Sequence, residues 1–136
     1  MKPEDKQIVF QDLCARLPYH VRCKIWLNKY GTTEEGPLDL EHNYGDVLQD
    51  AFFYHDRIKD IKPYLRPLST MTEEEIIEFN NIPSTKNYTI IANDLPWDVA
   101  HYKQIDWLNK KMFDFRGLIP KGLAIKVTDE NNPYKD

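Results

Sequence analysis

Apolar residues in the first part of the chain recur at the spacing of an amphipathic helix. Three of them are four residues apart, and two more lie beside these: Val9, Leu13 and Leu17, with Phe10 and Cys14. The spacing gives one apolar face and predicts a helix over residues 6–17. Pro18 ends this helix, because a proline does not fit a helix interior.

The pattern then changes to a period of two. Over residues 21–28, apolar side chains alternate with polar and charged ones. Such alternation is typical of a half-buried strand, and Trp26 falls on its polar side. A weaker alternation around Leu38 predicts a partner strand. Residues 47–54 fit either a short helix or a third strand over Ala51–Tyr54.

The clearest local signal of the chain follows a stretch that contains two prolines. Residues 61–68 cannot form a regular helix, because each proline restricts itself and the residue before it. The next residues fit a capping box, with Thr72 as the N-cap and Glu75 three positions later. We expect a helix from there to about Asn80.

The second half of the chain alternates between the same two kinds of pattern. Residues 88–92 are rich in β-formers and predict a strand, and residues 105–112 carry a helical stripe of apolar side chains. Residues 123–127 alternate again and predict a closing strand. Residues 128–136 are polar, so we expect a flexible tail there.

Together these elements predict an α+β fold. We expect a single domain over residues 1–136, with a small, mainly antiparallel sheet and two or three packed helices. The length is that of one ordinary domain. The composition, 41% hydrophobic and 12% aromatic, is that of a folded core and differs from that of disordered chains.

Charge and cysteine content narrow the class of protein. The formal net charge of −4 argues against general nucleic-acid binding, for which a basic surface is expected. No apolar run approaches the roughly 20 residues of a membrane helix, and the polar amino terminus resembles no signal peptide. We therefore expect a cytoplasmic protein, and in a reducing cytoplasm we expect Cys14 and Cys23 to be free thiols.

Four segments of the chain form a recognisable set. They are Asp12–Tyr19 ("DLCARLPY"), Ile61–Leu68 with the following Ser69–Glu75, and Trp107–Ala124 ("WLN…FDFRGLI…KGLA"). These segments resemble a group of small uncharacterised proteins of Bacteroides-type gut bacteria and their phages and prophages. The resemblance implies a phage or mobile-element setting and no particular activity. Relatives often carry a His-His pair where this chain has Lys111-Met112, so a metal role for that pair would not transfer.

Candidate chemistry is sparse. Cys14, His20 and Cys23 lie close in sequence, but structural zinc usually needs four ligands, and the alternative is that both cysteines face the core. A nucleophilic pair such as Cys14 with His101 stays open, because such pairs are spatial rather than sequential. There is no P-loop and no nucleophile elbow. We therefore assign no catalytic residue, no metal and no cofactor.

Five residues are candidates for binding. Tyr64 with Arg66, and Phe115 with Arg116, each place an aromatic ring and an arginine in an irregular segment. Arginine stacks on rings and binds carboxylate or phosphate with two hydrogen bonds. Trp97 follows a proline in a loop and suits an interface. The alternatives are that the arginines tie down loops and that the tryptophan packs inside.

An excess of acidic residues marks the segment 34–60. It holds eight carboxylates against Arg57 and Lys59. Such a face suits a basic partner or imitates nucleic-acid charge, and the alternative is a solvated face.

Three functions follow as hypotheses. The first is a non-enzymatic binding protein that acts on a host or phage protein, with an anti-defence or regulatory role. The second is capture of a small anionic ligand such as a nucleotide. The third is a small hydrolase. The sequence favours a binding protein over an enzyme and does not indicate the oligomeric state.

Overall fold

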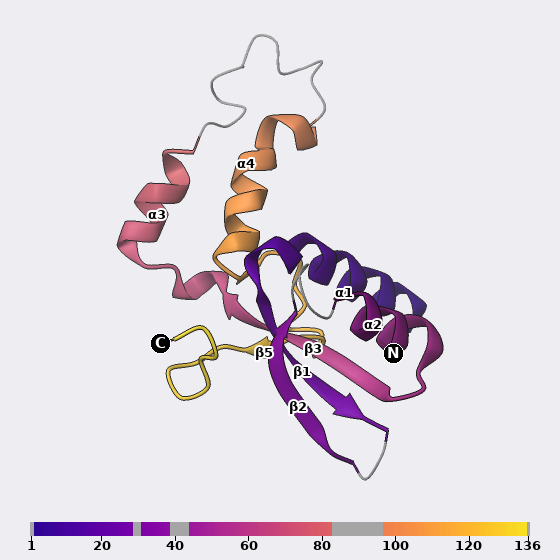
Figure 1. The fold of residues 1–136 in the computed structure, drawn as a ribbon. Helices are drawn as coiled ribbons and strands as arrows, with labels where there is room; N and C mark the ends of the chain where they lie inside the picture. Colours follow the sequence, from indigo (N-terminus) through magenta and orange to yellow (C-terminus); the bar gives the residue numbers. More distant parts are fainter. Residues whose placement is uncertain (1, 29–30, 39–43, 83–96, 136) are drawn as a thin grey trace.

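The computed structural model describes residues 2–28, 31–38, 44–82 and 97–135 (Figure 1). For Tyr44 and residues 97–101 it describes the backbone alone. The predicted strand over residues 88–92 lies outside the described residues. No helix of the described part is both long and apolar enough to cross a lipid bilayer.

The described residues form four α-helices, single turns of other helices, and one five-stranded sheet. The α-helices are α1 (Pro3–Arg16), α2 (Tyr44–Gln49), α3 (Glu73–Asn80) and α4 (Trp97–Lys110). Turns of 3-10 helix span Leu17–Tyr19 and Leu68–Thr70, and a π-helical turn spans Asp50–Tyr54. The strands are β1 (Val21–Leu27), β2 (Thr33–Leu38), β3 (Ile58–Pro67), β4 (Phe113–Asp114) and β5 (Ile125–Lys126). The predicted α+β class is confirmed.

The sheet is mainly antiparallel, as the alternating patterns predict. The longest strand, β3, pairs antiparallel with β1, which pairs antiparallel with β2. The two short strands β4 and β5 pair with β3 in parallel, through its last four residues. Pro63 is the last residue of β3 that pairs with β1, and the parallel pairs begin at Tyr64. The missing N–H of Pro63 therefore falls at a boundary between two sets of pairs, where the ladder loses least.

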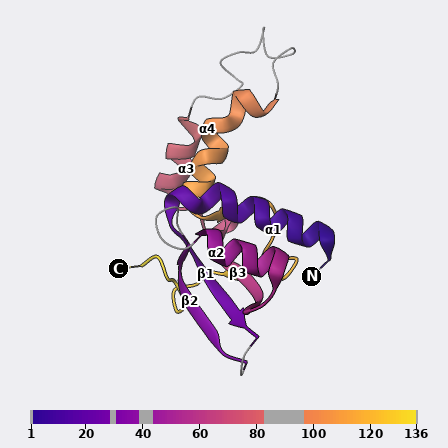
Figure 2. The same cartoon turned by 45° about the vertical axis from the view of Figure 1, so that its right-hand side comes forward.

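Helices α1 and α2 lie against one face of the sheet (Figures 1 and 2). The core is built from the apolar stripe of α1 and from the inward-facing side chains of the strands. It contains Val9, Leu13, Leu17, Val21, Cys23, Leu38, Ile61 and Leu65, with Leu48, Ala51 and Phe52 from α2 and the turn after it. The predicted α1 stripe is thus buried as expected, except for Cys14, which is exposed.

Residues 51–54 are helical, so the strand alternative for them is wrong. Asp50 begins this turn, and its carboxylate accepts hydrogen bonds from the backbone N–H groups of Asp56, Arg57 and Ile58 at 2.5–3.1 Å. These bonds turn the chain from the helical segment into β3. Burial raises the pKa of the Asp50 carboxyl, but the three backbone donors outweigh burial, and the net pKa is lowered.

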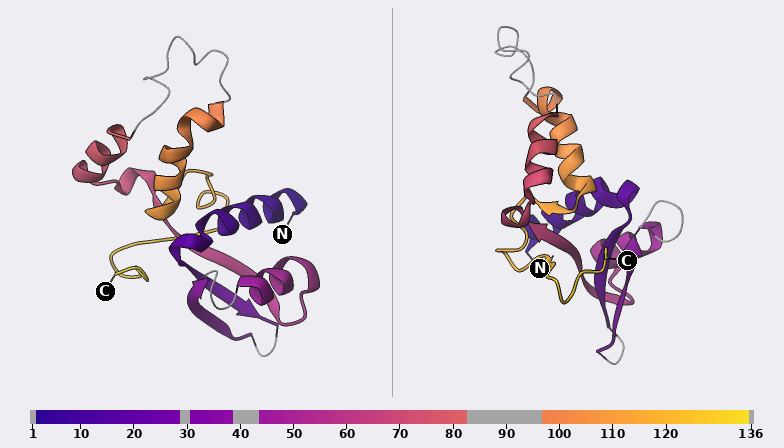
Figure 3. Two further views of the ribbon diagram at one scale, coloured as in Figure 1. Left: turned by 45° about the horizontal axis from the view of Figure 1, so that its top comes forward. Right: turned by 90° about the vertical axis from the view of Figure 1, so that its left-hand side faces the viewer.

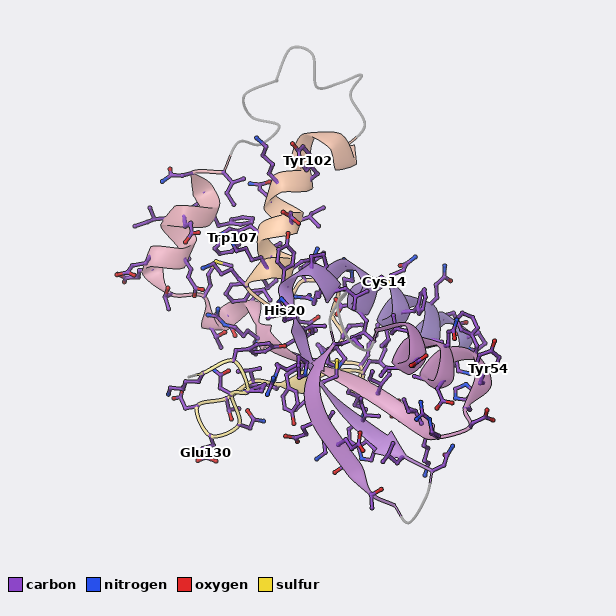
Figure 4. The ribbon with its side chains drawn as sticks, in the orientation of Figure 1. Cys14, His20, Tyr54, Tyr102, Trp107 and Glu130 are labelled. Atoms are coloured by element: carbon purple, nitrogen blue, oxygen red, sulfur yellow. The ribbon has the colours of Figure 1, made fainter. Side chains whose placement is uncertain are left out.

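Helices α3 and α4 project away from the sheet as a pair, which we call the arm (Figures 1 and 3). The predicted capping box is present at the start of α3: the Thr72 side chain accepts from the Glu75 N–H, and the Glu75 carboxylate accepts from the Thr72 N–H. A second, smaller apolar cluster holds the arm together. It contains Trp107, Leu108 and Phe113, with Met71, Phe79, Ile82 and Phe115 around them. Figure 4 shows Trp107 between the two helices.

The C-terminal segment is tied to the sheet by one tyrosine. The Tyr134 hydroxyl accepts from the Arg22 N–H at 3.0 Å and donates to the Tyr64 carbonyl at 2.7 Å. This hydroxyl lies next to the last β1–β3 pair, where the two strands separate. It therefore bridges them with hydrogen bonds beyond the end of their pairing. The flexible tail predicted for residues 128–136 stays a prediction about mobility, and the contacts of Tyr134 favour an anchored segment.

Candidate functional site

Arg116, one of the five binding candidates, lies in a buried ionic group. Its guanidinium donates to Asp12 Oδ1 at 2.5 Å and to Asn109 Oδ1 at 3.1 Å, and it stacks 4.2 Å from the centre of the Phe115 ring. Burial lowers the pKa of Arg116, and the neighbouring Asp12 carboxylate opposes this shift. The two residues of this candidate pair therefore contact each other and the interior of the protein, as the loop-tying alternative has it.

Asp12 also holds Arg16, a fully buried arginine of α1. Arg16 Nε donates to Asp12 Oδ2 at 3.0 Å, and its two terminal nitrogens donate to three backbone carbonyls. These belong to Leu108 and Asn109 at the end of α4 and to Phe113 in β4, at 2.6–3.4 Å. We call Asp12, Arg16 and Arg116 the ionic junction, because they join α1 to the base of the arm.

The ionic junction explains two of the segments that carry the resemblance. Asp12–Tyr19 supplies the carboxylate and one arginine, and Trp107–Ala124 supplies Arg116 and the three carbonyls. Within the second segment, Asp114 accepts from the N–H groups of Leu118 and Ile119 at 2.9 Å and fixes the following turn. These motif residues stabilise the fold, since a buried charge must be paired and hydrogen-bonded.

Arg66 is also held by its own chain. It forms two hydrogen bonds with the Glu75 carboxylate, at 2.7 and 2.8 Å, and its guanidinium lies 4.1 Å from the centre of the Phe113 ring. The hydrogen bonds from Arg66 and the burial of the site have opposite effects on Glu75, and the net result lowers its pKa from 4.5 to about 2. This pair attaches the capping box of α3 to the end of β3.

Tyr64 and Trp97 complete the candidate residues. Tyr64 is buried in β3, and its hydroxyl donates to the Glu35 carboxylate of β2 at 2.6 Å. Burial and this acceptor raise the pKa of Tyr64 to about 12. Trp97 is the first residue of α4, so its predicted position in a loop is wrong, and its side chain lies outside the described part of the chain. Tyr64 and Arg66 lie in the strand β3, so the irregular segment predicted for them is wrong as well. The four candidates whose side chains are described do not form one site, because they bind different carboxylates of the protein or pack in its interior.

The residues proposed for metal or nucleophile chemistry are not assembled either. Cys14 is exposed and Cys23 is buried, and burial raises the pKa of both thiols. Among the described residues, no three histidine, cysteine or acidic side chains are placed to hold a metal ion. The side chain of His101 lies outside the described residues, so its pairing with Cys14 stays a hypothesis.

The acidic residues of segment 34–60 separate into distinct roles. Asp50 is internal, and Glu35 binds Tyr64 and lies 4.0 Å from the ammonium of Lys24. Asp39 and Glu41 lie outside the described residues. Asp60 accepts from the Ile61 N–H at 2.9 Å and lines a different hollow. The last three line one hollow together: Glu34, Asp46 and Asp56.

Residues of β1, β2, α2, β3 and the turn before β3 line this hollow, which we call the acidic groove. Its volume is about 550 Å³. Four aliphatic side chains of the strands and α2 line it: Ile25, Leu27, Val47 and Ile58. Three carboxylates and the single guanidinium of Arg57 share the lining, which gives it a formal charge of −2. This lining suits a ligand in which an apolar group lies next to a positively charged group.

Sequence reasoning found the acidic segment but missed both the groove and the ionic junction. Asp12 and Arg16 are four residues apart, which in a sequence indicates an exposed pair on one helix face. The groove depends on which carboxylates lie close to Ile25 and Leu27 in the fold. Of the three, strand alternation places only Glu34 on that face of the sheet. Comparison with family models, with curated proteins and with solved structures finds no match to this chain.

Proposed function

We propose that the protein is a non-enzymatic binding protein, and that its acidic groove docks a basic, amphipathic segment of a partner protein. The observation that carries this proposal is the lining of the groove. Aliphatic side chains that the core covers only in part lie beside three carboxylates. Among the described residues of the lining, none is histidine, serine or cysteine, so these residues offer no Ser–His or Cys–His pair for hydrolysis.

The two kinds of lining residue would act on the partner in different ways. Burial of an aliphatic side chain against Ile25, Leu27 and Val47 would supply affinity, at about 25 cal/mol per Å² of apolar surface. The carboxylates would select lysine or arginine next to that side chain and would speed association at low salt. Arg57 would repel a positive charge of the partner that lies next to it. This repulsion would help to fix the orientation of the bound segment.

The proposed setting rests on the sequence. The resemblance to proteins of Bacteroides-type bacteria and their phages supports a host or phage protein as the partner, with an anti-defence or regulatory outcome. The exposed free thiol of Cys14 is compatible with the cytoplasmic location proposed from the sequence. The structure gives no support to a hydrolase, which therefore stays the least favoured hypothesis.

Charge reversal in the groove tests the proposed function. Fluorescent peptides that combine leucine with lysine or arginine, and matched peptides with glutamate instead, are titrated with the full chain. We expect saturable binding of the basic peptides alone, and a loss of about tenfold or more in Asp46→Lys/Asp56→Lys, because two attractive charges become repulsive.

The control is Glu74→Lys/Glu130→Lys, which makes the same change in net charge at exposed residues outside the groove. It should retain most of the affinity at 150 mM salt. Equal loss in both double variants would show general electrostatic attraction and contradict the docking site. Binding of short cationic amphiphiles but of no peptide would assign the groove to a small ligand and contradict the protein partner.

A further inference from the structure

A second hollow lies at the base of the arm. It has a volume of about 760 Å³ and is bounded by the end of α4, the residues before α3, and the C-terminal segment. We call it the basic cleft. Its lining includes Tyr19, Arg66, Lys110, Lys111, Lys126 and Tyr134. It shares no residue with the acidic groove.

The charge of the basic cleft is opposite to that of the whole chain. Four cationic side chains and one carboxylate line it, whereas the chain has a formal net charge of −4. Arg66 is already neutralised by Glu75, with which it shares two hydrogen bonds. The excess positive charge therefore comes from three lysines that converge from two elements: Lys110 and Lys111 at the end of α4, and Lys126 in β5.

The lysine ammonium groups are available to a ligand. In the described part of the chain, neither Lys110 nor Lys126 forms an ion pair with a carboxylate. Lys111 lies 6.0 Å from the centre of the Trp107 ring, a contact that leaves its ammonium protons free for a polar partner. Three lysines against the one carboxylate of Asp129 give the described lining an excess of positive charge, which would attract an anion.

Four of the five hydroxyl groups of the lining donate to the protein, and the fifth, that of Thr72, accepts from the Glu75 N–H. Tyr19 donates to Asp106 at 2.5 Å, and Thr70 donates to the Pro67 carbonyl at 2.6 Å. Thr128 donates to Asn131 at 2.8 Å, and Tyr134 donates to the Tyr64 carbonyl. The ammonium groups are therefore the main donors that remain. Lysine binds phosphate as a point charge without the bidentate geometry of arginine, so it selects charge density over a planar shape.

We propose that the basic cleft binds a compact polyanion with at least two phosphate groups, such as pyrophosphate or the phosphate chain of a nucleotide. Three ammonium groups match the two or three charges of such a chain. The volume lies within the range of small-ligand sites, which is about 300–1,000 Å³, so a nucleoside attached to the chain also fits. The site is independent of the acidic groove and of the proposed protein partner.

The first experiment titrates the full chain with pyrophosphate, ADP, adenosine and sulfate, by calorimetry and by thermal unfolding. We expect pyrophosphate or ADP to bind saturably and raise the unfolding temperature by linkage, and adenosine and sulfate to have no comparable effect. Equal affinity for pyrophosphate and ADP would define a phosphate-chain site. Tighter binding of ADP would define a nucleotide site. Absence of saturable binding up to 10 mM ligand at low salt would overturn the proposal.

Matched lysine variants locate the site. Lys110→Gln/Lys126→Gln removes two of the three ammonium groups and should weaken binding by about tenfold or more, the effect of losing hydrogen bonds to a charged group. Lys103→Gln/Lys121→Gln removes the same charge from exposed positions outside the cleft and should retain the affinity. Equal weakening in the two double variants would overturn the assignment to this cleft. An unchanged unfolding temperature of both double variants in the absence of ligand would show that they are folded.

Discussion

At the scale of single residues, arginine next to an aromatic ring has a structural role in this protein. Arg66 lies over Phe113 and Arg116 over Phe115, at 4.1 and 4.2 Å from the ring centres, and each also holds a carboxylate of its own chain. In the sequence, an arginine near an aromatic residue suggests ligand recognition. In this structure, the two arginines instead pair with carboxylates of their own chain. A ligand would first have to break an internal ion pair, so lysines without such partners are better candidates for recognition.

The Arg66–Glu75 pair makes stability depend on acid pH. The pKa of Glu75 is lowered from 4.5 to about 2, so its carboxylate stabilises the folded state in full above pH 4.5. This contribution is lost as the pH falls from 4.5 toward 2. We therefore expect Glu75→Gln to lower the thermal unfolding midpoint at pH 6 and to differ less from the parent protein at pH 3.

Thermal unfolding followed by fluorescence at pH 6, 4.5 and 3 checks this expectation. Glutamine keeps an oxygen that accepts from the Thr72 N–H, so the change removes charge from the Arg66 pair and spares the capping box. Glu74→Gln, which changes an exposed glutamate of the same helical turn, is the control. A deficit of Glu75→Gln that is the same at all three pH values would show that charge on Glu75 is not the cause.

At the scale of elements, sequence patterns predict those helices and strands that depend on residues close together in the chain. The stripe of α1, the alternation of β1 and the capping box of α3 each arise from neighbouring residues, and each is present. The central strand β3 was not predicted as a strand, because its prolines obscure the pattern and its pairing depends on residues far along the chain. Residues 51–54 were ambiguous for a similar reason, since Asp50 fixes their helical path through N–H groups beyond the turn.

The candidate binding sites follow the same division. The acidic character of residues 34–60 is visible in the sequence, but which carboxylates meet at the acidic groove depends on the sheet and α2. The three lysines of the basic cleft are separated by up to 16 positions, 110 to 126, and the parallel pairing of both β4 and β5 with β3 brings them together. Composition therefore predicts a class of partner, and topology determines the site.

The attachment of the C-terminal segment can be measured at one atom. Tyr134→Phe removes the hydroxyl and leaves the Arg22 N–H and the Tyr64 carbonyl without that partner, which should cost about 1–3 kcal/mol of stability. Urea unfolding measures the loss, and hydrogen exchange at the Arg22 amide should become faster. Burial raises the pKa of Tyr134, so its contribution is complete below the ordinary tyrosine pKa of about 10 and declines at higher pH.

Tyr102→Phe is the matched control, because Tyr102 is 58% exposed. It should change the unfolding free energy by less than about 0.5 kcal/mol. If the two variants had the same stability, the hydroxyl of Tyr134 would contribute nothing net to the fold. The flexible tail predicted for residues 128–136 would then describe this segment better than an anchored one.

At the scale of the whole molecule, polar contacts connect two apolar clusters. The larger cluster fills the space between the sheet, α1 and α2, and the smaller one lies in the arm. The ionic junction links them, because Arg116 reaches from the base of the arm to Asp12 of α1 and Arg16 reaches back to the end of α4. The basic cleft also lies at this base, so its geometry depends on how firmly the arm is held.

We therefore expect Arg116→Met to uncouple the arm from the body. Two reporter proteins, both carrying Trp97→Phe, keep either Trp107 of the arm or Trp26 of the sheet as their single tryptophan. In the parent background their urea transitions should coincide, as in a cooperative domain. With Arg116→Met, Asp12 loses one of its two cationic partners, and the Trp107 transition should move about 1 M lower than that of Trp26. Arg57→Met, which removes an exposed guanidinium, should leave the two transitions together. Transitions that shift equally in Arg116→Met would mean that the apolar contacts alone make the arm and the body one cooperative unit, and that the ionic junction sets only its total stability.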